Sequence, residues 1–114
     1  MAQPDSPTVE EITPQEFIVR RAAGKPMKLI DVREPWELKI APVPSETEHI
    51  PMAELSARVT DLDPAVETVV ICRSGGRSLQ AAHFLARHGF RNVKNLTGGI
   101  LAWSRDVDPS IQTY

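Results

Sequence analysis

The chain has 114 residues, of which 41% are hydrophobic, and a formal net charge of −2. These values describe a single globular domain with enough apolar residues for a core of its own. The net charge argues against a nucleic-acid-binding surface, and no apolar run reaches the length needed to cross a membrane. The one cysteine excludes an internal disulfide and a cysteine-rich metal site, and it favours a reducing, cytoplasmic location.

The folded domain is expected to span residues 8–108, without internal repeats. Residues 1–7 are polar and contain two prolines, which is typical of a flexible N-terminal tail and lacks the apolar core of a signal peptide. Asp108-Pro109 is expected to end the ordered part, which leaves residues 109–114 as a C-terminal tail.

The first elements in chain order are a strand, a helix and a second strand. A short strand is predicted at residues 8–12. The sequence Thr-Pro-Gln-Glu at residues 13–16 forms a capping box with proline at the first helical position, so a helix begins there. It is expected to stop at Gly24. Residues 27–32 predict the second strand.

The least regular part of the sequence is residues 38–55. Its three prolines exclude a continuous helix and a central strand. We expect a connection that runs over the top of the sheet, with Ile50 in the core and His49 exposed to solvent. A short helix is predicted at residues 56–62.

The stretch that carries the chemistry begins with a buried strand at residues 69–71, which are all β-branched. An Ala-rich helix is predicted from about Arg77 to His88, ending at Gly89. The residues that connect the strand to this helix are Cys72, Arg73, Ser74, Gly75, Gly76 and Arg77.

The order of strand, cysteine, glycine-containing loop and helix favours a reactive thiolate at Cys72. Two glycines allow the backbone to turn tightly with its N–H groups pointing inward, and the helix N-terminus carries partial positive charge. These groups and two arginines favour the charged sulfur, whereas burial opposes it. We therefore expect the pKa of Cys72 to lie below the usual value of ~8.5. An inert core cysteine is the weaker interpretation, because it needs neither the glycines nor the arginines.

The remaining chain predicts a strand at residues 93–96 and a helix after residues 97–99. Alternating strands and helices imply a parallel sheet with helices on both faces. Asp31 and Arg33 then emerge at the same edge of the sheet as Cys72. Their spacing leaves two interpretations open, exposed surface charge or a buried ion pair that braces the cysteine loop.

The two histidines on the predicted helix before Gly89 lack a partner at metal-ligand spacing. His83 and His88 are therefore interpreted as solvated or capping residues, and no metal site is predicted.

Three stretches in this order resemble a single-domain rhodanese. They are Asp-Val-Arg-Glu-Pro-Trp-Glu at residues 31–37, Cys-Arg-Ser-Gly-Gly-Arg-Ser at 72–78, and Asn-Leu-Thr-Gly-Gly-Ile-Leu-Ala-Trp at 95–103. The resemblance covers residues 9 to about 107. It implies a three-layer α/β/α fold with a central, mostly parallel five-stranded sheet, and sulfurtransferase chemistry through a cysteine persulfide.

The resemblance also implies roles for individual residues. Cys72 matches the sulfur carrier, and residues 73–77 match the active-site loop. Arg33 matches an arginine that supports this loop, Trp103 matches a packing aromatic near it, and Asp31 is structural. The implied partners are a small anionic sulfur donor and a cyanide, thiol or protein acceptor, with no metal, organic cofactor, nucleic acid or membrane.

Two departures from the family pattern stand out. Residues 44–47 (Pro-Ser-Glu-Thr) replace a usual Gly-Ala turn. Ser74 stands where thiosulfate-specialised members often carry lysine, which leaves the donor open.

Two other functions remain as alternatives. One is a sulfur-carrier or partner-docking domain without turnover of its own. The other is a cysteine-based phosphatase or arsenate-reductase-like enzyme, whose loop is one residue longer than the four residues between Cys72 and Arg77.

Overall fold

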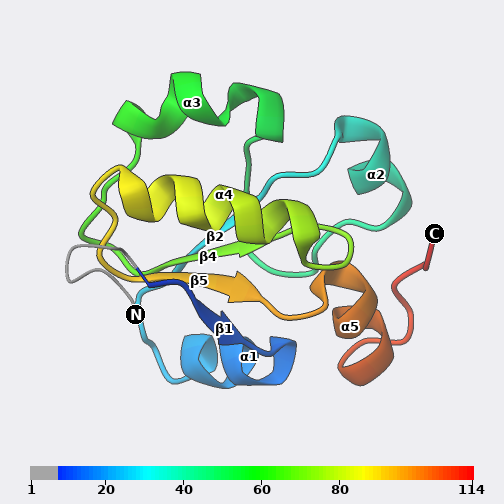
Figure 1. Cartoon of the computed structure of the whole chain (residues 1–114). Coiled ribbons are helices and arrows are strands. Elements are labelled where there is room, and N and C mark those ends of the chain that lie inside the picture. Colours follow the sequence, from blue (N-terminus) through cyan, green and yellow to red (C-terminus); the bar gives the residue numbers. More distant parts are fainter. Residues whose placement is uncertain (1–7) are drawn as a thin grey trace.

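A five-stranded parallel sheet lies at the centre of the chain, and helices cover both of its faces (Figure 1). The computed structural model describes residues 8–114, so the tail expected at residues 1–7 lies outside the described residues. The strand order is β1-β5-β4-β2-β3, and every neighbouring pair is parallel. The expected α/β fold is confirmed, with a sheet that is parallel throughout. The elements in chain order are β1 (Glu10–Ile12), α1 (Pro14–Ala22), β2 (Lys28–Asp31), α2 (Pro35–Ile40), β3 (Glu48–His49), α3 (Leu55–Arg58, between two 3₁₀ turns), β4 (Thr68–Ile71), α4 (Gly76–Arg87), β5 (Val93–Leu96) and α5 (Gly99–Asp106).

The alternation of side chains along β4 builds a separate core on each face of the sheet. Val69 and Ile71 lie in the apolar cluster that α1 and α5 cover. Val70 and Cys72 lie in the cluster that α3 and α4 cover. The sulfur of Cys72 therefore belongs to the α4 side of the sheet, next to the helix that follows it.

Local signals in the sequence set the helix ends as predicted. At the start of α1, Thr13 Oγ1 accepts from the Glu16 N–H at 3.1 Å, and Glu16 Oε1 accepts from the Thr13 N–H at 2.9 Å. After α4, the Phe90 N–H donates to the Leu85 carbonyl at 3.2 Å, and Phe90 is buried. The capping box and the helix stop near Gly89 are both confirmed.

The sequence did not predict α2. This helix has Pro35 in its first turn, and Glu37 accepts from the Glu34 N–H at 2.8 Å. A glutamate stands where Ser or Thr usually caps a helix, so the start signal was weaker than that of α1.

The sequence also did not predict β3, an edge strand of two residues that pairs with β2. The prolines of this region lie outside the strand and do not interrupt its pairing. Ile50 is fully buried as expected. The expectation that His49 is exposed is wrong, because this half-buried residue belongs to β3 and its Nε2 lies 2.6 Å from the Arg33 carbonyl oxygen.

The last residues of the chain are also placed against the domain, so the expectation that order ends at Asp108-Pro109 is wrong. Ile111 is buried in the cluster under α1 and α5, and its carbonyl accepts from the Ser104 hydroxyl at 2.8 Å. This anchor lets Tyr114 reach the carboxyl edge of the sheet, where the Arg33 guanidinium donates to its hydroxyl at 2.9 Å.

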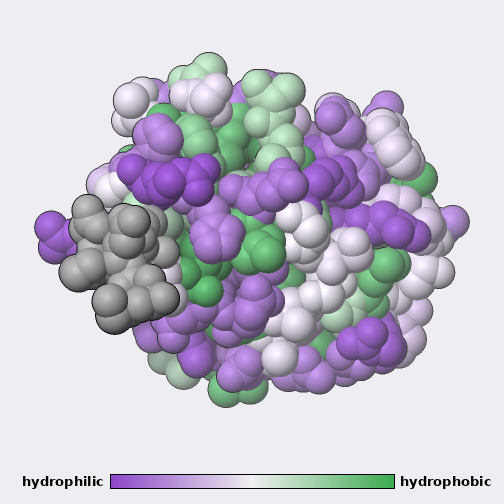
Figure 2. Space-filling view, in the orientation of Figure 1, coloured by the Kyte–Doolittle hydropathy of each residue, from purple (hydrophilic) through white to green (hydrophobic). Residues whose placement is uncertain are grey.

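The surface visible in the orientation of Figure 1 mixes polar and apolar residues (Figure 2). Within residues 8–114, none of the helices has the length and apolar character that crossing a bilayer requires.

The first turn of α5 holds the loop that follows β4. The Ile100 N–H donates to the Cys72 carbonyl at 2.9 Å, and the Leu101 N–H donates to the Arg73 carbonyl at 3.1 Å. Gly99 has a φ of +61°, and a Cβ there would overlap both carbonyl groups. The two segments approach this closely only because residue 99 has no side chain.

We predict that Gly99→Ala lowers the free energy of unfolding by more than about 2 kcal/mol, because it combines a left-handed backbone with a clash against backbone atoms. Urea unfolding measures this change. Gly24→Ala is the matched control, since Gly24 also has a positive φ (+87°) but has open space around it. The free energy of unfolding of this control should fall by only about 1 kcal/mol. Equal losses in the two variants would contradict the close-approach argument.

Candidate active site

The loop between β4 and α4 folds around the sulfur of Cys72. The Gly75 N–H donates to Cys72 Sγ at 3.1 Å, and the Ser78 hydroxyl oxygen lies 3.2 Å from the same sulfur. Gly75 precedes α4 with a φ of +109°, a conformation that glycine adopts without strain. Ser74 and Gly76 are exposed on the loop. The side chain of Cys72 is thus buried while the rest of its loop reaches the surface.

The environment of Cys72 favours its thiolate. Burial is the strongest single influence and opposes ionisation, but the Ser78 hydroxyl and the backbone N–H groups of Ser78, Gly75 and Ser74 together hold the pKa of Cys72 below its ordinary value. This direction agrees with the sequence-based prediction. A cysteine with a lowered pKa is a better nucleophile near neutral pH than an ordinary thiol.

Both loop arginines have partners within the chain. The Arg77 guanidinium donates to both carboxylate oxygens of Glu37, at 2.8 and 2.9 Å. Arg73 donates from Nε to the Tyr114 carbonyl at 2.6 Å, and its guanidinium lies 5.2 Å from the centre of the Tyr114 ring. Because Glu37 pairs with Arg77, the loop carries less unpaired positive charge than two free arginines would give it.

Asp31 and Arg33 form a buried ion pair, which excludes the surface-charge interpretation. Both are at most 1% exposed, and Arg33 donates to the Asp31 carboxylate from Nε at 3.1 Å and from Nη2 at 2.8 Å. The Tyr114 hydroxyl, which accepts from Arg33, donates in turn to Glu37 Oε1 at 2.9 Å. Hydrogen bonds through Tyr114 and Glu37 therefore link Arg33 to Arg77. The role of Arg33 in supporting the cysteine loop stays a prediction.

Trp103 lies in the core and belongs to a different apolar cluster from Cys72. Its ring packs at 5.9 Å from that of Phe17, between α1 and α5. Trp103 is nevertheless on α5, the helix whose first N–H groups bind the Cys72 and Arg73 carbonyls. Any effect of Trp103 on the loop would therefore pass through the position of α5.

The sequence did not predict a role in the site for several residues that the structure places there: Ser78, Asn95, Glu37, Tyr114 and Gly99. Asn95 offered a signal, since asparagine is unusual inside a buried strand. Tyr114 offered none, because it follows the predicted end of the domain.

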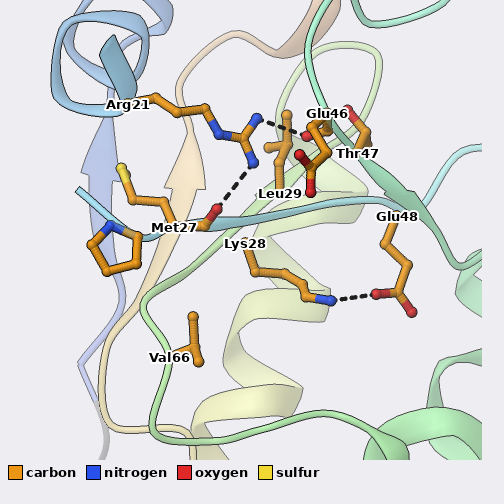
Figure 3. A pocket seen from close by; sticks show the side chains of 9 residues that line it. Arg21, Met27, Lys28, Leu29, Glu46, Thr47, Glu48 and Val66 are labelled. Atoms are coloured by element: carbon orange, nitrogen blue, oxygen red, sulfur yellow. Dashed lines mark hydrogen bonds and ion pairs between the residues drawn. The ribbon is translucent and has the colours of Figure 1, made fainter. Parts of the chain in front are cut away.

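Two cavities of similar volume lie away from Cys72. Figure 3 shows one of about 480 Å³ where β2 begins, at the opposite end of the sheet from the cysteine loop. Its wall includes Arg21, which donates to the Glu46 and Met27 carbonyls at 2.7 and 2.9 Å, and Lys28, which pairs with Glu48 at 2.6 Å. The contact between Arg21 and the Glu46 carbonyl ties the unusual 44–47 connection to α1. Residues 8–114 contain no cluster of three or more His, Cys, Asp and Glu side chains that could hold a metal ion.

We predict that Glu37→Gln destabilises the protein by about 2 kcal/mol at neutral pH, because it removes a buried charge that Arg77 and Tyr114 bind. Hydrogen bonds from Arg77 outweigh burial and lower the pKa of Glu37 to about 2. A carboxyl group with a lowered pKa contributes stability above its unfolded pKa of ~4.3, and the contribution disappears as pH falls towards 2.

The difference in unfolding free energy between wild type and Glu37→Gln should therefore shrink between about pH 4 and pH 2. Urea unfolding at several pH values measures it. Asp106→Asn is the control, because Asp106 pairs with Arg105 on the exposed surface and such pairs contribute little. If the loss of unfolding free energy in Glu37→Gln stays constant down to pH 2, the stabilising role of the Glu37 charge is contradicted.

Comparison with known proteins agrees with the fold. The Rhodanese-like domain family matches residues 13–106. The chain is 46% identical over 91 residues to Rhodanese-like/PpiC domain-containing protein 12, chloroplastic, of Arabidopsis thaliana, which covers 76% of this chain and 30% of that protein. The chain spans between 24% and 30% of the length of the first plant relatives it matches.

Two further proteins match over most of their length. The protein named Sulfurtransferase of Allochromatium vinosum is 35% identical over 103 residues, which cover 90% of this chain and 95% of that protein. The crystal structure of a rhodanese-related protein from Thermoplasma volcanium matches with a TM-score of 0.76 and 28% identity, covering 86% of this chain and 93% of that chain. The chain therefore belongs to the Rhodanese-like domain family.

Proposed function

We propose that this chain transfers a sulfane sulfur from a small anionic donor, such as thiosulfate, to a thiophilic acceptor through a persulfide on Cys72. The observation that carries the proposal is the environment of Cys72 Sγ, which accepts from the Gly75 N–H at 3.1 Å and has a lowered pKa. The similarity to a protein named Sulfurtransferase supports the same reaction class.

The reaction consists of two displacements at sulfur. The Cys72 thiolate attacks the outer sulfur of thiosulfate, a new S–S bond forms, and the S–S bond of the donor breaks to release sulfite. Cys72 then carries a persulfide anion. Cyanide or an acceptor thiolate attacks the terminal sulfur, which releases thiocyanate or a new persulfide and regenerates the Cys72 thiolate.

The loop supports both steps by the position of its backbone N–H groups. These donors face the sulfur and favour negative charge there, as an oxyanion hole does for oxygen. The chain has one cysteine, so no second thiol can discharge the persulfide within the chain. The acceptor must come from outside, and no metal or organic cofactor is needed. A catalytic cysteine that must stay reduced suits a reducing compartment such as the cytoplasm.

The proposal predicts that incubation with thiosulfate adds the mass of one sulfur atom to the protein and that cyanide removes it. Intact-protein mass spectrometry measures both steps, and thiocyanate formation measures turnover. Cys72→Ser should show neither the added mass nor turnover, with an unchanged far-ultraviolet circular dichroism spectrum. Thiocyanate production by Cys72→Ser at the wild-type rate would overturn the assignment of Cys72.

Loop length separates this function from that of a cysteine-based phosphatase. Four residues separate Cys72 from Arg77, which gives a ring of N–H donors sized for one sulfur atom. The wild-type protein should turn over thiosulfate and hydrolyse aryl phosphates negligibly. Insertion of a glycine between Gly75 and Gly76 should widen the ring and reduce sulfur transfer. Strong phosphatase activity of the wild type that disappears in Cys72→Ser would favour the phosphatase instead.

A further inference from the structure

A chain of hydrogen bonds leads from Cys72 through the sheet to β1. The Ser78 hydroxyl, which lies 3.2 Å from Cys72 Sγ, donates to Asn95 Oδ1 at 2.5 Å. Asn95 Nδ2 donates to the Glu11 carboxylate at 3.1 Å and to the Gly75 carbonyl at 3.2 Å. Ser78 and Asn95 are 0% and 3% exposed, so solvent cannot replace these partners.

The orientation of the Asn95 amide follows from its neighbours. A carboxylate and a backbone carbonyl can only accept hydrogen bonds, so the NH₂ group must face Glu11 and Gly75. The amide oxygen then faces Ser78. Thr97 also donates to Glu11 Oε1, at 2.8 Å, which holds the carboxylate in place.

Ser78 has one hydroxyl proton and two neighbours that can accept it, Asn95 Oδ1 and Cys72 Sγ. When Cys72 is a thiol, the S–H can donate to Ser78 while Ser78 donates to Asn95, so every group is satisfied. When Cys72 is a thiolate, Ser78 stabilises it only by turning its proton away from Asn95. The buried amide oxygen then lacks a donor, which is unfavourable.

We propose that Asn95 is a positioning residue that limits the reactivity of Cys72 by competing with its sulfur for the single proton of Ser78. The inference rests on the proposed function only in taking Cys72 as the nucleophile. It assigns Asn95 an effect opposite in sign to that of Ser78. A general loosening of the loop would not produce that opposition.

Other charged and titratable groups also surround this site. They come from β1, the end of β2, α2, the loop itself and the C-terminal segment: Glu11, Asp31, Arg33, Glu37, Arg73, Arg77 and Tyr114. Most are paired with one another, and a control must separate their charge from the hydrogen-bond competition.

The test is a pH titration of the Cys72 thiolate by its ultraviolet absorbance in the purified chain. The chain has one cysteine and one tyrosine, and burial raises the pKa of Tyr114, which moves its ionisation away from that of the thiol. Asn95→Leu should lower the midpoint by roughly half a unit to one unit, because Ser78 can then donate to the sulfur without losing a partner. Ser78→Ala should raise the midpoint, because the thiolate loses a donor.

The double variant tests whether Asn95 acts through Ser78. Asn95→Leu should leave the midpoint of Ser78→Ala unchanged if the hydroxyl is the intermediary. Glu11→Gln is the charge control, because it removes the carboxylate charge and keeps an acceptor for Asn95 Nδ2. Its midpoint should stay close to that of wild type.

Two results would overturn the inference: a midpoint in Asn95→Leu that is unchanged or raised, or a shift in Glu11→Gln as large as that in Asn95→Leu. Asn95→Ala provides the same comparison if the leucine variant does not fold. The persulfide assay distinguishes the two proposals. Persulfide formation with no midpoint shift in Asn95→Leu rejects the role of Asn95 alone, whereas the predicted shifts without a persulfide reject the proposed function alone.

Discussion

The close approach of α5 to the cysteine loop is the constraint on which the rest of the site depends. The loop's first two carbonyl groups, those of Cys72 and Arg73, accept from N–H groups of α5. Because these carbonyls point outward to α5, the loop can direct the Gly75 N–H inward to the sulfur. Gly99 permits the approach, since a Cβ there would overlap both carbonyls. The two glycine-containing turns at this edge of the sheet therefore act together.

Charge pairing is the second feature that shapes the site. Arg33 pairs with Asp31 and Arg77 pairs with Glu37, whereas Arg73 makes a hydrogen bond to the Tyr114 carbonyl. Buried charges are tolerated only with such partners. Pairing keeps the guanidinium groups in fixed positions around the loop, but it reduces the positive field that an incoming anion would meet. Under the proposed function, backbone N–H groups carry more of the stabilisation of the transferred sulfur than the number of arginines suggests.

The features that could be predicted from sequence depend on neighbouring residues. The β-branched run before Cys72, the two glycines after it and the capping box at Thr13 are signals of this kind, and the structure has the expected elements there. The features that were missed depend on distant contacts. Tyr114 and Glu37 are 77 positions apart, and no local sequence pattern predicts their hydrogen bond. The burial of Asp31 and Arg33 depends on packing from later elements, so their spacing could not decide between surface and core.

Asn95 shows how the strand order itself creates part of the site. In the order β1-β5-β4, β5 lies between the strand that carries Glu11 and the strand that leads to Cys72. Asn95 pairs in register with Glu11 on one side and Val70 on the other. One side chain can therefore contact both β1 and the cysteine loop, although these segments are far apart in sequence. An asparagine inside a buried strand is normally unfavourable, but here the topology supplies a partner for each of its polar atoms. The same contacts that make Asn95 tolerable in the core bring it within reach of the groups that set the protonation of the cysteine.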